Sequence, residues 1–141
     1  MNAIVVGTDG SRGAKAAVQK VAELMAGSGA TVHVVCAYPG RSTLERIGMT
    51  ARQESVDLRG VAADVLARAE SRLREAGLDV EKHVREADPA QAIIDVADEQ
   101  GAVLIAVGAR SGVGRGRFML GGVPAKLSHH LPTSLLIVRE S

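Results

Sequence analysis

A short apolar run that stops at glycine, Ala3-Ile4-Val5-Val6-Gly7-Thr8-Asp9-Gly10, decides the fold of this chain. A brief, β-branched run that is apolar at every position is typical of a strand buried on both faces of a parallel sheet. The period then changes: apolar residues recur at helical spacing from Ala14 to Met25, after Ser11 as the expected N-cap and before Gly27 as a stop signal. A buried strand that leads directly into a helix predicts a βα unit.

The remainder of the chain repeats this alternation. We expect further strands at residues 31–37, 78–86, 102–107 and 134–138 and helices at residues 52–76, from Asp88 onward and at 123–130, with a loop over 39–51. Asp88 is expected to cap its helix, and Gln91 occupies the capping-box position. The buried stripe of the 52–76 helix is predicted to contain Leu58, Val61, Ala62, Val65, Leu66, Ala69 and Leu73.

The order βαβαβαβαβ predicts an α/β fold. We expect a single domain over residues 1–141, built on one doubly wound, five-stranded parallel sheet with strand order 3-2-1-4-5 and helices on both faces. One domain also suits the length of 141 residues.

Composition excludes several classes of function. The net charge is +1 and aromatic residues make up 1% of the chain, so we expect neither a nucleic-acid partner nor an anionic membrane surface as a partner. No apolar run is long enough for a membrane span, and the chain enters its first strand without a basic segment typical of a secretory signal. With Cys36 as the lone cysteine, these features predict a cytoplasmic protein.

Two glycine-rich turns are expected to meet at one crevice. In an open doubly wound sheet, ligands bind beyond the carboxyl ends of the strands where the strand order reverses, here between the first and fourth strands. Those strands are followed by residues 7–10 and by residues 108–122, and six of the latter fifteen residues are glycine. Exposed backbone N–H groups and the start of the next helix can cradle a phosphate group.

The distribution of charge supports a phosphate site. From residue 101 onward the chain carries five basic residues and one acidic residue, and Arg110, Arg115 and Arg117 lie within the glycine-rich segment. Asp9 follows the first strand and is a candidate ligand for a ribose hydroxyl or Mg²⁺, with a turn-forming role as the alternative. The segment contains neither a P-loop nor a complete Gly-x-Gly-x-x-Gly fingerprint.

We expect the cysteine and the histidines to have structural roles. Cys36 is interpreted as a small buried residue, with a redox sensor as the alternative. His129 and His130 are adjacent and point to different helix faces, so we expect no shared metal ion there. His33 and His83 are expected to lie apart in separate strands, with no carboxylate at ligand spacing.

The sequence resembles the universal stress protein family over its whole length. The resemblance rests on the strand that runs into Gly7-Thr8-Asp9-Gly10-Ser11, on Gly108-Ala109-Arg110-Ser111 followed after nine residues by Gly121-Gly122-Val123, and on the closing segment 129–138. Nucleotide-binding members of the family carry Gly-x2-Gly-x9-Gly-Ser/Thr. Here the spacing is kept, but Ser111 replaces the second glycine and Gly122 replaces the hydroxyl residue.

The resemblance implies an adenine nucleotide, ATP, AMP or cyclic AMP, with Mg²⁺ as an optional companion held through Asp9. Its implied nucleotide-binding residues are Gly7, Thr8, Asp9, Ala37, Val107, Gly108, Ser111, Gly121, Gly122 and Val123, and Arg110 is a candidate phosphate contact from its charge. The absence of a hydroxyl at Gly122 removes one phosphate contact and is compatible with a shorter ligand than ATP.

The last strand is expected to lie at an apolar sheet edge, which invites pairing with another chain. The resemblance implies a homodimer through this strand, with Leu135, Leu136, Ile137 and Val138 at the interface. Together these features predict an adenine-nucleotide-binding stress-response module without dedicated catalysis. The alternatives are a dimeric interaction scaffold that binds no nucleotide and a weak ATPase.

Overall fold

An open sheet of five parallel strands forms the centre of the molecule. The structure, a computed structural model, describes residues 2–40, 51–109, 127 and 133–140. Its strands are β1 (Ala3–Gly7), β2 (Thr31–Tyr38), β3 (Asp79–Glu86), β4 (Leu104–Gly108) and β5 (Ser134–Val138). They follow the order β3-β2-β1-β4-β5, so the predicted order 3-2-1-4-5 is confirmed.

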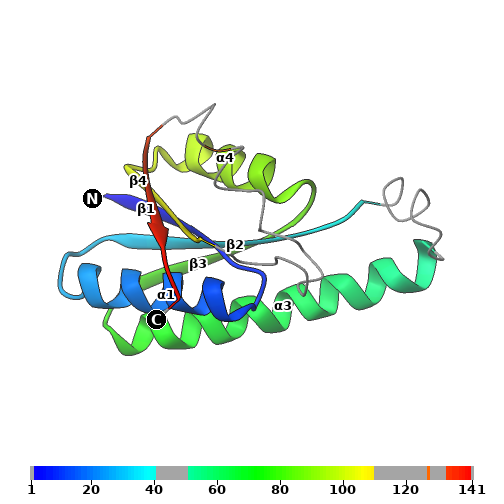
Figure 1. The fold of residues 1–141 in the computed structure, drawn as a ribbon, viewed down its shortest axis with the longest axis horizontal. Helices are drawn as coiled ribbons and strands as arrows, with labels where there is room; N and C mark the ends of the chain where they lie inside the picture. Colours follow the sequence, from blue (N-terminus) through cyan, green and yellow to red (C-terminus); the bar gives the residue numbers. More distant parts are fainter. Residues whose placement is uncertain (1, 41–50, 110–126, 128–132, 141) are drawn as a thin grey trace.

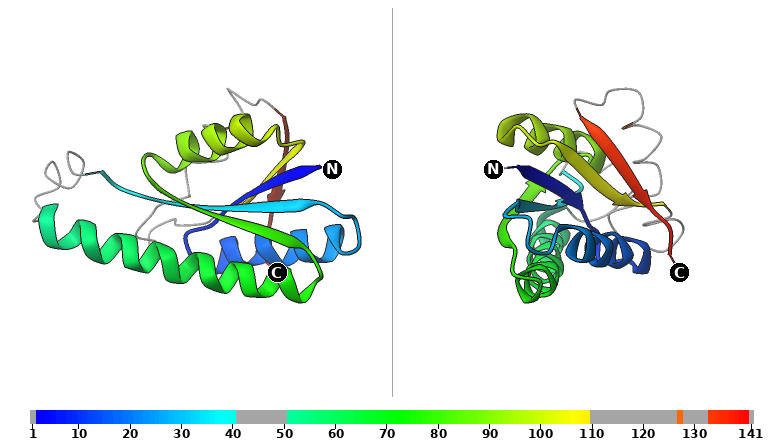
Figure 2. Two further views of the ribbon diagram at one scale, coloured as in Figure 1. Left: turned by 180° about the vertical axis from the view of Figure 1, so that it is seen from behind. Right: turned by 90° about the vertical axis from the view of Figure 1, so that its left-hand side faces the viewer.

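Helices cover both faces of the sheet. Helices α1 (Arg12–Met25) and α3 (Ala51–Glu75) lie on one face, and α4 (Pro89–Gln100) lies on the other (Figures 1 and 2). Of the helix predicted at 123–130, the structure describes Leu127, which is helical and fully buried on the α4 side. The arrangement confirms a doubly wound α/β fold.

The strands contribute to two hydrophobic clusters because successive side chains point to opposite faces. In β2, Val32, Val34 and Cys36 pack toward α1 and α3, whereas Val35 and Ala37 pack toward α4. Both faces of β2 are therefore apolar over most of its length, as expected for a strand inside a parallel sheet.

Side chains cap two of the helices at their first turns. The Ser11 hydroxyl accepts a hydrogen bond from the Ala14 N–H, and the Asp88 carboxylate accepts one from the Gln91 N–H at 3.2 Å. Both predicted N-caps are confirmed. The side-chain amide of Gln91, at the capping-box position, donates forward to Asp95 at 2.8 Å.

The fourth strand begins two residues later than predicted. Gly101 ends α4 in a left-handed conformation with φ +61°, and the Ala102 N–H then donates to the Ala97 carbonyl. Regular pairing with β1 starts at Leu104, opposite Ile4, and β4 continues to Gly108. Ala102 and Val103, which the apolar pattern assigned to the strand, therefore belong to the end of α4 and the connection to β4.

The two edge strands differ in character. β3 is rich in charged residues, whereas β5 exposes Ile137, with 46% of its surface accessible. Among the described helices, none combines the length and the hydropathy needed to cross a membrane.

Candidate functional site

The turn after β1 lies where the strand order reverses, between β1 and β4. The Thr8 N–H donates to the Val35 carbonyl at 2.9 Å, which holds the turn against β2. Within the turn, the Gly10 N–H donates to the Thr8 hydroxyl and the Ser11 N–H donates to Oδ1 of Asp9. Gly10 has φ +79°, a conformation that favours glycine. The sequence from Gly7 to Ser11 therefore builds one compact turn at the carboxyl edge of the sheet.

Asp9 presents an unused acceptor at this edge. Its side chain is buried, and Oδ1 is occupied by the Ser11 N–H, but Oδ2 has no hydrogen-bond partner among the described residues. A buried carboxylate oxygen without a donor is costly, by about 1–3 kcal/mol or more. The Oδ2 atom can therefore accept a hydrogen bond from a hydroxyl group or bind a cation.

The end of β4 lies beside this turn. Val6 pairs with Ala106, and a methyl group at Gly7 would lie 3.5 Å from Cγ1 of Val107. Gly108 pairs with Val138, and the Ala109 N–H donates to the Val138 carbonyl at 2.8 Å. The structure therefore brings Gly7, Val107 and Gly108 to one edge of the sheet.

Ala37 lies near the carboxyl end of β2 and is buried in the α4-side cluster together with Val107. Together with Gly7, Thr8, Asp9 and Gly108 it belongs to the same edge of the sheet. The remaining predicted binding residues, Arg110, Ser111, Gly121, Gly122 and Val123, lie outside the described residues.

A cavity of about 270 Å³ opens next to the turn, between α1 and α3. Thr8 and Gly10 line it on the sheet side, Val65 and Ala69 supply apolar walls, and the basic residues Lys15, Arg68 and Arg72 also line it. Arg68 and Arg72 both belong to α3. Their spacing of four residues on α3 places them on one side of the helix, and only the packing of α3 against α1 brings Lys15 to the same cavity.

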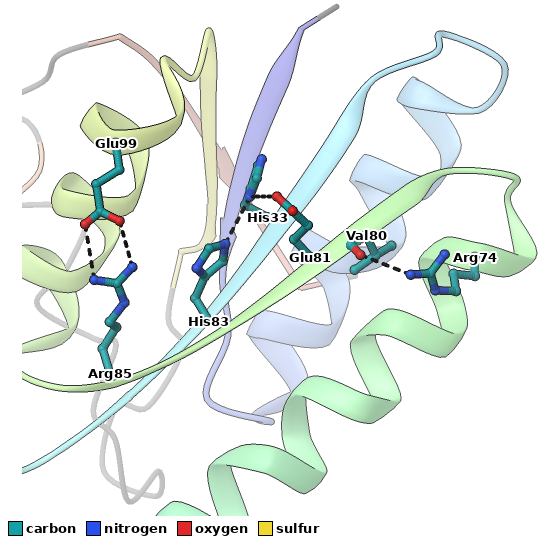
Figure 3. Close-up of polar contacts among 7 residues, drawn as sticks. All are labelled: His33, Arg74, Val80, Glu81, His83, Arg85 and Glu99. Carbon is teal, nitrogen blue, oxygen red and sulfur yellow. Dashed lines mark hydrogen bonds and ion pairs between the residues drawn. The ribbon is translucent and has the colours of Figure 1, made fainter.

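Two histidines that we expected to lie apart are in contact, so that prediction is wrong. The Nδ1 atom of His33 lies 3.0 Å from Nε2 of His83 and 3.1 Å from Oε2 of Glu81 (Figure 3). The reason is the register of β2 and β3, which pairs His33 with Glu81 and Val35 with His83. Residues two apart on a strand face the same way, so Glu81 and His83 both reach toward His33.

Cys36 is a buried thiol with no redox character in this fold. It is fully buried on the α1 and α3 side, and burial raises its pKa to about 12, with a further contribution from the charge of Asp9. Since the thiolate is the reactive form, Cys36 stays protonated and inert at neutral pH. The interpretation as a small buried residue is confirmed.

The residues predicted at a dimer interface lie on edge strand β5. Val138 is buried, Leu135 and Leu136 are half-buried, and Ile137 is exposed. Leu135 packs against the α4-side cluster and Leu136 against the opposite one, so β5 alternates between the two layers of the core.

An open parallel sheet whose order reversal holds a buried carboxylate oxygen without a partner among the described residues is an α/β architecture of the kind that places ligands at this edge. The sequence identifies which such family this is. The chain belongs to the universal stress protein family, whose family model matches residues 1–139.

Individual relatives cover nearly the whole chain. The universal stress protein Rv1636 of Mycobacterium tuberculosis (strain ATCC 25618 / H37Rv) is 34% identical over 145 residues, which cover 98% of this chain and 96% of the relative. A crystal structure of a universal stress protein in complex with cAMP is 31% identical, covers 99% of this chain and 98% of that one, and has a TM-score of 0.71. The universal stress protein of Archaeoglobus fulgidus in complex with dAMP is 25% identical, covers 98% and 97%, and has a TM-score of 0.70.

Proposed function

We propose that this protein is a regulatory module that binds an adenine nucleotide at the carboxyl edge of β1, β2 and β4. The observation that carries the proposal is Asp9, whose buried Oδ2 atom lacks a donor among the described residues. A ribose hydroxyl is a donor of the required kind. Two relatives support the choice of ligand, because one is a complex with cAMP and the other is a complex with dAMP.

The choice among AMP, cyclic AMP and ATP follows from the phosphate end of the site. Gly122 stands where nucleotide-binding members carry a hydroxyl residue, so one phosphate contact is missing. A charge-assisted hydrogen bond contributes about 1.5–3 kcal/mol, and its loss weakens a triphosphate that depends on it. We therefore propose AMP or cyclic AMP ahead of ATP, with Mg²⁺ at Asp9 needed only for a polyphosphate.

The module binds and does not turn over its ligand in this proposal. Cys36 is protonated, and Oδ1 of Asp9 is engaged in the turn. A nucleophile, a base and an orienting group do not converge among the described residues at this edge. Any hydrolysis of ATP is expected to be slow. The module is proposed to act in the cytoplasm, as its lone cysteine in thiol form suggests.

Nucleotide binding is tested by isothermal titration calorimetry with AMP, cyclic AMP and ATP on wild type, Asp9→Asn and Asp98→Asn. The Asp9→Asn change removes the carboxylate acceptor, so we expect at least about tenfold weaker binding, equal to about 1.4 kcal/mol. Asp98→Asn removes the same charge from the exposed last turn of α4 and should bind like wild type.

A second variant, Gly121→Asp, adds a negative charge at a proposed phosphate contact and should abolish binding. If none of the three nucleotides binds wild type at millimolar concentration, the proposal fails and the chain is the nucleotide-free scaffold. If wild type instead releases phosphate rapidly from ATP, and Asp9→Asn abolishes this release, the protein is an ATPase.

We also propose that two copies of the chain pair through β5. No strand among the described residues pairs with its outer edge, and Ile137 adds exposed apolar surface there. Pairing through β5 would cover this strand edge and Ile137. In such a homodimer, nucleotide binding is proposed to change the contacts between the two copies or the surface that they present to another protein.

A further inference from the structure

A second group of polar side chains lies within the sheet, away from the proposed nucleotide site. Nδ1 of His33 on β2 faces two atoms from β3, Nε2 of His83 at 3.0 Å and Oε2 of Glu81 at 3.1 Å (Figure 3). One potential ligand atom from each residue lies within 4.8 Å of the others. All three atoms carry lone pairs that can bind a metal ion.

Nδ1 of His33 has two close partners but can form only one full hydrogen bond. A neutral imidazole has one N–H, so Nδ1 of His33 donates to Glu81 or to His83 but not fully to both. If Nδ1 of His33 instead accepts a hydrogen bond from Nε2 of His83, Nδ1 carries no proton, and two acceptors, Nδ1 and the Glu81 carboxylate, face each other. A cation placed among the three atoms would satisfy all of them at once.

The surroundings favour neutral histidines at this point. Desolvation by burial lowers the pKa of His33, although the charge of Glu81 opposes this, and desolvation followed by the charges of His33 and Arg85 lowers the pKa of His83. Neutral imidazole is the form that binds a metal ion.

Neighbouring cations are engaged with other partners. Arg85 makes two hydrogen bonds to Glu99, at 2.8 and 3.2 Å, and Lys82 pairs with Glu70 at 3.2 Å. Arg74 donates to Glu70 and to the Val80 carbonyl. The carboxylate of Glu81 is therefore left to the two histidines among these groups, as Figure 3 shows for the Arg85–Glu99 and Arg74–Val80 contacts.

Solvent reaches the cluster from one side. Most of the Glu81 side chain is accessible, at 60%, whereas only 4% of the His33 side chain is. A hollow of about 530 Å³ borders both residues and is also lined by Asn2, Thr31, Asp79 and Gln100. An ion could enter through this hollow and keep water molecules in its open coordination positions.

We propose that His33, Glu81 and His83 form a binding site for one divalent transition-metal ion of borderline softness, such as Co²⁺, Ni²⁺ or Zn²⁺. Two imidazole nitrogens and one carboxylate suit these ions, whereas Mg²⁺ and Ca²⁺ prefer oxygen ligands. Metal–nitrogen bonds of about 2.1 Å at right angles place neighbouring ligand atoms about 3.0 Å apart, close to the separations observed here. The two separations from His33 Nδ1 match neighbouring ligand positions of a six-coordinate ion, and water would complete its coordination.

This site is separate from the proposed nucleotide site. His33 precedes Ala37 by four residues on β2, which corresponds to about 13 Å along the strand. Metal binding at His33 and nucleotide binding at Asp9 can therefore be measured and lost independently.

The test uses untagged, metal-depleted protein titrated with CoCl₂ and with ZnCl₂, followed by visible absorption for Co²⁺ and by calorimetry for Zn²⁺. We expect one ion per chain. Glu81→Gln and His83→Gln should each weaken binding at least about tenfold, since each removes a ligand. Glu81 is exposed, so its variant is expected to fold, and circular dichroism checks both variants.

The matched control is the double variant His129→Gln/His130→Gln, which removes the other two histidines of the chain and should bind like wild type. Absence of saturable binding at one ion per chain would overturn the proposal and leave a hydrogen-bonded His–His–Glu cluster. Binding that survives both Glu81→Gln and His83→Gln would overturn it as well.

Discussion

Gly7 is needed for packing and not for an unusual backbone angle. It is not among the glycines with positive φ, but a Cβ atom there would overlap Cδ1 of Ile93 on α4. The missing side chain lets the end of β1 approach α4 closely, and this approach sets the position from which the Thr8 turn begins.

Gly7→Ala should therefore lower the free energy of unfolding by about 1–3 kcal/mol, the usual cost of overpacking. Ile93→Val removes the overlapping methyl group at its own cost of about 0.5–1.5 kcal/mol. In urea unfolding experiments, the double variant should lose less stability than the sum of the single changes.

Gly60→Ala is the control for this prediction, because Gly60 is an exposed residue of α3 with open space around it. Alanine there should stabilise the helix by up to about 1 kcal/mol. Strictly additive effects of Gly7→Ala and Ile93→Val would contradict the steric explanation.

At the scale of elements, the pairing of β2 with β3 determines the chemistry of the histidines. β3 is an edge strand with exposed charges, yet its residues Glu81 and His83 lie against buried His33. The same strand pair therefore carries an apolar side, built by Val32 and Val80, and a titratable side.

The lowered pKa values of His33 and His83 make the stability of this strand pair depend on pH. Unfolded histidine titrates near pH 6.5, so between that value and the lower folded pKa values the unfolded chain binds more protons. The contribution to stability is complete above about pH 6.5 and is lost as the pH falls toward the folded pKa values. Urea unfolding in EDTA should show stability decreasing from pH 7.5 to pH 5.5.

The variant His83→Gln should flatten this decrease, because one of the two shifted groups is gone. His129→Gln/His130→Gln serves as the matched control and should keep the wild-type slope. A slope that His83→Gln leaves unchanged would show that other groups cause the dependence.

At the scale of the whole molecule, the two edges of the sheet have different consequences. β3 presents charged side chains that discourage pairing, whereas β5 presents Ile137, and no described strand pairs with its outer edge. The proposed dimer therefore forms at β5, on the far side of β4 from the proposed nucleotide edge at β1.

Ile137→Lys should convert the proposed dimer into a monomer, because a charge at the centre of the edge would have to be desolvated on pairing. Light scattering coupled to gel filtration measures the mass. Leu24→Lys is the control, since Leu24 is also exposed, at 57%, but belongs to α1 and not to β5. A wild-type mass of one chain would remove the proposed dimer.

Local patterns were sufficient for most of the fold. The apolar runs that stop at glycine, together with the caps Ser11 and Asp88, predicted the described elements, and the alternation of strands and helices predicted their order. These signals are local because burial and capping act on neighbouring residues. The placement of Gly7, Thr8 and Asp9 at the order reversal followed from the same patterns.

Long-range packing decided what the patterns could not. Val61 belongs to the predicted buried stripe of α3 but is 38% exposed, whereas Leu58 and Ala62 on either side of it are buried. Lys15 and Arg68 line the same cavity only because α1 packs against α3. The contact of His33 with Glu81 and His83 depends on the register between two strands that lie about fifty residues apart in the sequence. The sequence by itself determined which segments form strands and helices and which turn follows β1, because those choices rest on local periodicity. Only the tertiary structure decided which side chains meet, because register and helix packing are settled by the whole core at once.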